Sequence, residues 1–212
     1  MNMRNWSFGL ALILLPGPAV WAVTQTEKVH NDKVLTVEQA LAPGETITLP
    51  ADHAGVLVYL GAGSIETTPP QGKPKTETVK RGEAVFLTPR AGELKNHGST
   101  NLRIVRVEYL GNGGSETWGT TGLVSDYKLL FENRYGRVYD IRMATGKSVP
   151  LHSQHDRVVI CLSGAKLEHE MLDGRKQTST LKTGEIVWRR GGTHVGHNLG
   201  KTDLWVIAIE PK

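Results

Sequence analysis

Short apolar runs recur along most of the chain, and they predict β-strands rather than helices. The clearest runs are 56–60, 102–107, 158–162 and 204–209, which are rich in β-branched residues. Gly and Pro residues separate the runs, as in Pro43-Gly44 and Pro69-Pro70. Many short strands with turn signals between them are typical of a β-sandwich or a jelly-roll barrel. Segment 37–41 has a plausible helical pattern, but it is too short to change this all-β prediction.

The chain also matches itself at an offset of 102 residues. Gly44 falls on Gly146 and Asn96 falls on Asn198 without a gap. The same register aligns Val56, Leu60, Glu66, Gly82 and Glu108 with Val158, Leu162, Glu168, Gly184 and Glu210. A register that holds across both turns and strands indicates a duplicated unit. We therefore predict two tandem β-barrels, at 23–110 and 124–212, joined by a Gly-rich linker at 111–123.

The first 22 residues have the pattern of a secretory signal peptide. A single positive charge, Arg4, precedes a long apolar stretch, and small residues at Val20 and Ala22 suit cleavage after Ala22. The stretch is interrupted by prolines and is short for a bilayer-spanning helix. We therefore expect a periplasmic or secreted protein with no stable membrane anchor after cleavage.

Charge and cysteine content bear on two questions, whether the protein binds nucleic acid and whether disulfides hold its fold. The formal net charge is +4, and the basic residues are interleaved with acids, so nothing in the pattern favours nucleic-acid binding. The single cysteine, Cys161, cannot form an internal disulfide and lies in an apolar run. The fold must therefore be held by its apolar core, with Cys161 as a small buried side chain.

The second unit contains a pattern that resembles the two motifs of the cupin family. The first family motif reads Gly-x-x-x-x-x-His-x-His, with a later Glu and a closing Gly, and the second motif opens with Gly and ends His-x-x-x-Asn. Here the first motif begins at Gly146 and reaches His152, while the second begins at Gly184 and ends at His194 and Asn198. With the duplication, the resemblance covers nearly all of 23–212 and implies a bicupin, two cupin barrels in tandem.

The resemblance implies a divalent metal, such as Mn, Fe, Ni or Zn, inside the second barrel. Side chains two apart on a strand point to one face, so a His-x-His pair delivers two imidazoles into one cavity. Gln154 stands at the second of these positions, and His155 is displaced by one, onto the opposite face unless the strand bulges. His152 and His194 thus match ligand positions, and either Gln154 or His155 is the candidate third ligand.

The first unit lacks these candidate ligands. Pro50, Asp52 and Gly92 occupy the places of His152, Gln154 and His194. Ligand chemistry is therefore expected in the second unit, and the first is expected to act as a scaffold, a homodimerisation surface or a lid. Only His155 has a counterpart, His53, and this match favours a structural role for His155.

Three functions are compatible with the sequence. The first is binding of a small molecule in a pocket lined by His152, Gln154, Trp188 and His194. The second is a metal-dependent enzyme of the dioxygenase or isomerase type, with His152, His194 and either His155 or Gln154 as metal ligands. The third is a purely structural exported protein. Trp188 aligns with Phe86, so a place in the core or in an interface is the alternative for this side chain.

Overall fold

The computed structural model describes residues 23–90, 92–115, 118 and 124–212. The predicted signal peptide and part of the predicted linker lie outside these residues. The described chain forms eighteen strands in four sheets, which confirms the all-β fold class. Segment 37–41 belongs to a strand and not to a helix. No helix in the described residues is long and apolar enough to cross a membrane.

The first barrel consists of two antiparallel sheets. The five-stranded sheet has the order β1 (Thr24–His30), β2 (Val34–Leu41), β9 (Leu102–Tyr109), β4 (Gly55–Tyr59) and β7 (Ala84–Leu87). The four-stranded sheet has the order β3 (Thr46–Leu49), β8 (Gly92–Asn96), β5 (Gly63–Thr68) and β6 (Lys75–Val79). Apart from the hairpins β1–β2 and β5–β6, each connection crosses from one sheet to the other, as in a jelly roll.

The second barrel repeats the first strand for strand. Its five-stranded sheet has the order β10 (Tyr127–Glu132), β11 (Gly136–Met143), β18 (Leu204–Pro211), β13 (Arg157–Ser163) and β16 (Ile186–Arg189). Its four-stranded sheet has the order β12 (Ser148–Gln154), β17 (Gly192–Asn198), β14 (Ala165–Met171) and β15 (Lys176–Leu181). The pairing register also repeats, since Val56 lies opposite Phe86 and Val158 lies opposite Trp188.

A buried asparagine explains one of the repeated residues. The side-chain nitrogen of Asn96 donates to the carbonyls of Leu41 and Thr100, and its oxygen accepts from the Gly98 amide. Asn198 makes the same three bonds with the residues 102 positions further along. Both side chains are almost fully buried, so each ties a sharp turn to the end of a neighbouring strand in its barrel.

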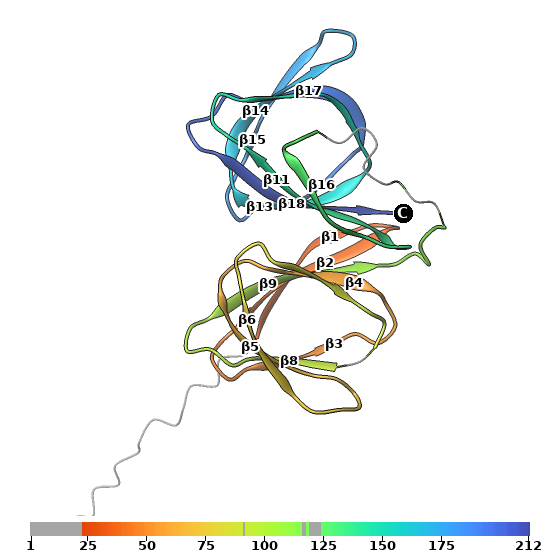
Figure 1. The fold of residues 1–212 in the computed structure, drawn as a ribbon, viewed down its shortest axis with the longest axis vertical. Helices are drawn as coiled ribbons and strands as arrows, with labels where there is room; N and C mark the ends of the chain where they lie inside the picture. Colours follow the sequence, from red (N-terminus) through yellow and green to blue (C-terminus); the bar gives the residue numbers. More distant parts are fainter. Residues whose placement is uncertain (1–22, 91, 116–117, 119–123) are drawn as a thin grey trace, which may run out of the picture.

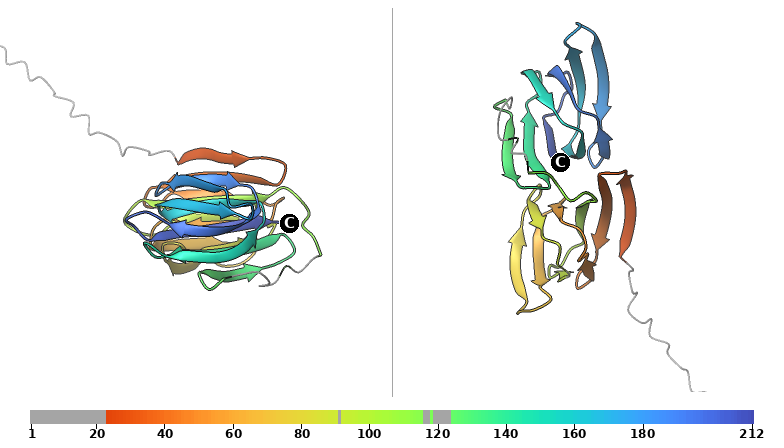
Figure 2. Two further views of the ribbon diagram at one scale, coloured as in Figure 1. Left: turned by 90° about the horizontal axis from the view of Figure 1, so that it is seen from above. Right: turned by 90° about the vertical axis from the view of Figure 1, so that its right-hand side faces the viewer.

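The two barrels share a hydrophobic core where their five-stranded sheets face each other. Figure 1 shows the barrels stacked along the long axis, with the four-stranded sheets at the far ends, and the side view in Figure 2 shows the same stack. Residues of both barrels, including Val56 and Val158, form one buried cluster between the five-stranded sheets. At its edge Tyr135 stacks between Phe86 and Tyr109.

A tight turn of the first barrel also presses against the second. Gly82 has a positive φ of 79°, and a Cβ atom built on it would lie 2.4 Å from the Trp205 ring. Arg81 places its guanidinium over the same ring, 5.2 Å from the centroid, and donates to the Leu162 carbonyl. The glycine therefore serves both the turn and the close approach of the barrels.

Candidate functional site

The second barrel encloses a cavity of about 290 Å³ between its two sheets. Its apolar wall includes Met143, Val149, Leu167, Leu181 and Leu204. The sequence explains why this barrel is hollow. At five interior positions the first barrel carries the larger residue: Ile47, Leu57, Tyr59, Leu94 and Ile104 stand where the second barrel has Val149, Val159, Cys161, Gly196 and Val206. The opposite exchange also occurs, since Leu181 and Tyr139 stand where the first barrel has Val79 and Val37.

Gly196, the glycine among these five residues, leaves space in the barrel interior that a larger side chain could fill. A Cβ atom added to Gly196 would find no atom nearer than Val149 Cβ at 4.0 Å, and the residue has an ordinary backbone conformation. In the first barrel the same position holds Leu94, which is 1% exposed within the core. The interior of one barrel is thus filled by side chains, whereas the interior of the other is left open.

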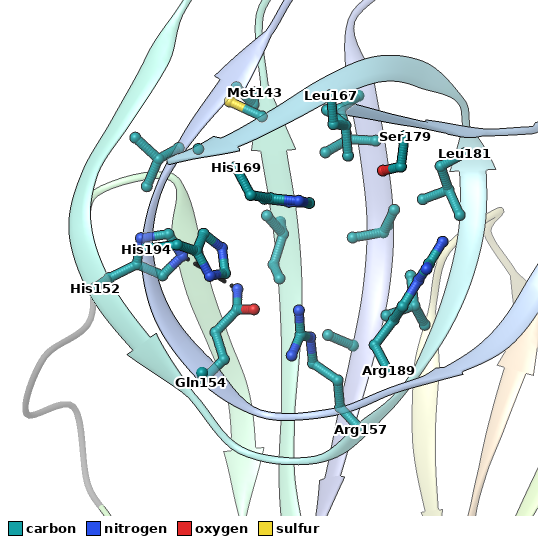
Figure 3. Close-up of a pocket in the computed structure, with 18 of the residues that line it drawn as sticks. Met143, His152, Gln154, Arg157, Leu167, His169, Ser179, Leu181, Arg189 and His194 are labelled. Atoms are coloured by element: carbon teal, nitrogen blue, oxygen red, sulfur yellow. Dashed lines mark hydrogen bonds between the residues drawn. The ribbon is translucent and has the colours of Figure 1, made fainter. Parts of the chain in front are cut away.

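Three histidines project into this cavity from adjacent strands of the four-stranded sheet (Figure 3). His152 on β12 lies directly opposite His194 on β17, and the ring centroids are 4.7 Å apart. His169 on β14 is diagonal to His194, with a centroid distance of 4.6 Å. A bulge between Val149 and His152 shifts the register of β12. Both of these residues therefore face the interior although they are three positions apart.

Hydrogen bonds fix the His152 ring. Its Nδ1 lies 2.8 Å from the Pro150 carbonyl, which can only accept, so Nδ1 carries the proton. Its Nε2 therefore accepts, and the Tyr127 hydroxyl lies 2.9 Å away. The Gln154 amide nitrogen contacts both the Tyr127 hydroxyl and, at 3.2 Å, the same Nε2. Gln154 Oε1 is buried without a hydrogen-bond partner in the described residues.

Burial keeps all three imidazoles neutral near pH 7. It lowers the pKa of His194 to about 3, with further lowering by repulsion from His169 and His152. Burial is also the main cause of the lowered pKa of His152 and of His169. For Tyr127, burial raises the pKa to about 12, so the hydroxyl stays protonated as a donor. The histidine cluster is therefore an uncharged, polar part of the cavity wall.

Neutral imidazole is a suitable ligand type for Mn, Fe, Ni or Zn, but in this structure the three rings are not arranged around a common metal position. Nε2 of His152, the nitrogen left free to ligate, is hydrogen-bonded to Tyr127. None of the described residues that line the cavity is an Asp or a Glu. Within the described residues no group of three or more His, Cys, Asp or Glu side chains is arranged to hold a metal ion. We therefore assign no reaction step to a metal.

The structure places two of the predicted site residues outside the cavity. His155 follows the end of β12; its amide donates to Glu210 Oε1 at 3.0 Å, and its ring stacks on Trp118 at 3.9 Å. It therefore does not join His152 and His194. Trp188 packs against the core between the barrels and does not line the cavity. Its alternative interpretation, as an interface residue, agrees with this position.

His152, Gln154 and His194 do lie together as expected, but sequence reasoning missed their neighbours. His169, Tyr127, Arg157 and Arg189 also line the cavity, as does Arg190, which follows Arg189. The signal that could have identified them is the comparison of the two repeats. Thr67, Gln25, Gly55 and Leu87 hold the places of the first four in the first unit. Each of these four missed residues is thus specific to the hollow barrel.

Comparison with known proteins identifies the fold. No protein-family model and no curated protein matches the sequence. Among solved structures, a cupin 2 conserved barrel domain protein from Leptotrichia buccalis matches with a TM-score of 0.60 and 16% identity, covering 94% of this chain and 92% of that one. AerE from Microcystis aeruginosa matches with a TM-score of 0.58 and 13% identity over 90% and 98% of the chains.

A third similar structure is oxalate decarboxylase from Bacillus subtilis. One structure of this protein, described for its Mn(II) centres, matches with a TM-score of 0.57 and 14% identity, covering 88% of this chain and 74% of that one. At such identities the likeness concerns the fold. Together with the strand order of both barrels, these matches show that the chain has the fold of the cupin superfamily, built as two barrels in tandem.

Proposed function

We propose that this protein is an exported bicupin that binds a small molecule inside its second barrel. One observation carries the proposal: the two barrels have the same strand order, but the second has smaller residues at five interior positions and three histidines that project into the resulting cavity. A polar group buried without a partner costs roughly 1–3 kcal/mol. The fold itself does not require His152, His169, Gln154 and His194, because the first barrel forms without them. A bound ligand would explain their presence, because it would supply hydrogen-bond partners inside the barrel.

The repeat supplies a test of this proposal. Val159→Leu and Gly196→Leu introduce the residues that fill the first barrel, and both should pack in the second. We expect the double variant to fold, to unfold at the same or a higher temperature, and to lose its ligand. Mass spectrometry of small molecules released on denaturation would compare it with the wild type. A molecule recovered equally from both proteins, or from neither, would contradict the proposal.

A metal-dependent enzyme of the dioxygenase or isomerase type is the second candidate. The observation that favours it is the group of three neutral imidazoles, His152, His169 and His194, on adjacent strands. The test is element-by-element metal analysis of protein purified from its native compartment and after incubation with Mn, Fe, Ni or Zn. Near-stoichiometric metal that disappears in His152→Ala would support this candidate. A wild-type metal content at background would remove it, and a protein without metal or ligand would be structural.

Export is part of the proposal and has its own test. The apolar segment before Ala22 supports cleavage at that residue. We expect the mature protein to begin near Val23 and to be recovered outside the cytoplasm. N-terminal sequencing of the exported fraction measures this directly, and a chain that still begins at Met1 would contradict it.

A further inference from the structure

Two arginines face each other across neighbouring strands at the mouth of the hollow barrel. Arg157 on β13 is paired directly with Arg189 on β16. Both side chains line the cavity and point into it in Figure 3. Like charges directly opposite each other in a sheet destabilise it. A negative charge close to both guanidinium groups would offset their repulsion.

The protein does not supply that charge within the cavity. No Asp or Glu is among the described residues that line it. Arg157 uses its Nη1 for two backbone carbonyls, of His155 at 3.2 Å and of Arg190 at 3.4 Å. Arg189 makes no ion pair with the described part of the chain.

The two acids that act on Arg157 electrostatically are both bound elsewhere. Asp156 accepts a hydrogen bond from the Gly191 amide at 2.7 Å, and this bond holds the turn that follows Arg189. Glu210 forms a buried ion pair with Arg137 at 2.8 Å. The arginine pair is thus held in place by its surroundings but is not neutralised by a carboxylate of its own.

The repeat shows that the fold does not need this pair. In the first barrel Gly55 on β4 lies opposite Leu87 on β7 at the corresponding register. A sheet of the same order forms there with no charge at either position. The arginines are therefore additions to the hollow barrel, placed where they face its interior.

We propose that the ligand of the second barrel is a small organic carboxylate whose anionic group is bound by Arg157 and Arg189. This inference rests on the proposed function. A guanidinium binds a carboxylate through two parallel hydrogen bonds. The apolar wall formed by residues such as Leu167 and Leu181 suits a short hydrocarbon body. The volume of about 290 Å³ is close to the lower end of the range of roughly 300–1,000 Å³ for small-molecule sites, so the ligand is small.

Paired probes test the charge requirement. Calorimetric titration of the full mature chain would compare benzoate with benzamide and hexanoate with hexanamide, since each amide keeps the shape and removes the charge. We expect each carboxylate to bind at least tenfold more tightly than its amide. Arg157→Gln and Arg189→Gln should each weaken carboxylate binding at least tenfold and leave amide binding unchanged. Arg142→Gln, at an exposed arginine outside the cavity, should change neither.

Several outcomes would overturn the inference. Amides that bind as tightly as carboxylates would show that the arginines do not select charge. Inorganic phosphate that binds as tightly as any carboxylate would show a site for simple anions. Carboxylate affinity unchanged in both arginine variants, or no binding of any probe at millimolar concentration, would equally refute it.

The filled-barrel variant, Val159→Leu with Gly196→Leu, separates this inference from the proposed function. If amides and carboxylates bind the wild type equally and both are lost in the filled barrel, the cavity binds small molecules and only the carboxylate assignment is wrong. If carboxylate binding survives in the filled barrel, the arginines act at the surface. The proposed function would then fail together with this inference.

Discussion

Acid is expected to destabilise the second barrel through its buried histidines. His194 is 9% exposed, and its folded-state pKa of about 3 lies far below the ordinary value of 6.5. Between these values the unfolded chain binds a proton that the folded chain does not. A base with a lowered folded-state pKa therefore contributes almost no penalty well above pH 6.5, and it reduces the free energy of unfolding as the pH falls through 6.5 toward 3.

The size of the effect follows from the two pKa values. At pH 7 about a quarter of unfolded chains carry the proton, and at pH 5 nearly all do, while folded His194 stays neutral at both. Lowering the pH from 7 to 5 should therefore cost about 2 kcal/mol for this residue. The figure depends on the ordinary value of 6.5 and hardly on the folded value, as long as the latter lies well below 5. His152 and His169 shift in the same direction and add to the loss.

Urea unfolding at pH 7 and pH 5 measures this difference. The wild type should lose about 2 kcal/mol more between the two pH values than His194→Gln, which has no proton to gain at this position. His97→Gln is the control, because His97 is exposed and lies outside the cavity; this variant should keep the full wild-type loss. An identical pH dependence for the wild type and His194→Gln would refute the reasoning.

Two further predictions use the repeat as its own control. Asn96→Ala and Asn198→Ala each remove three hydrogen bonds and should each lower the free energy of unfolding by about 2–4 kcal/mol; a loss confined to one variant in urea titrations would argue against equivalent roles. Gly82→Ala should cost about 1–3 kcal/mol more than Gly184→Ala, since both have positive φ but only the first would press on Trp205. Equal melting temperatures for the two glycine variants would contradict a rigid contact between the barrels.

The sequence was sufficient for the fold because the features that define it are local and repeated. Alternating apolar runs identify strands, and turn glycines such as Gly44 and Gly146 mark their ends with positive φ in both barrels. The register of 102 residues then links equivalent strands without any knowledge of their pairing. The error at 37–41 arose because a short buried run carries no reliable period, and antiparallel pairing of β2 with β1 and β9 decided its conformation.

The site was harder to predict because it depends on which face each side chain takes. Counting along β12 from His152 puts His155 on the opposite face, but a possible bulge kept it among the candidate ligands, and the count could not show that the strand ends before it. His169 lies on a strand outside the recognised motifs, so only spatial proximity to His194 reveals it. Trp188 faces the other barrel, and no pattern within one unit indicates which face of a sheet a second barrel will cover.

Cys161, at the position of Tyr59 in the first barrel, gives the second barrel a natural site for measuring how often it opens. Cys161 is the single thiol of the chain and is 1% exposed, and burial raises its pKa to about 11. A thiol reagent can reach it only when the strands around it separate, so the labelling rate follows the opening of this barrel and not of its filled neighbour. The opening of the second barrel can therefore be timed in the native sequence, before and after addition of a candidate ligand, and no probe needs to be engineered.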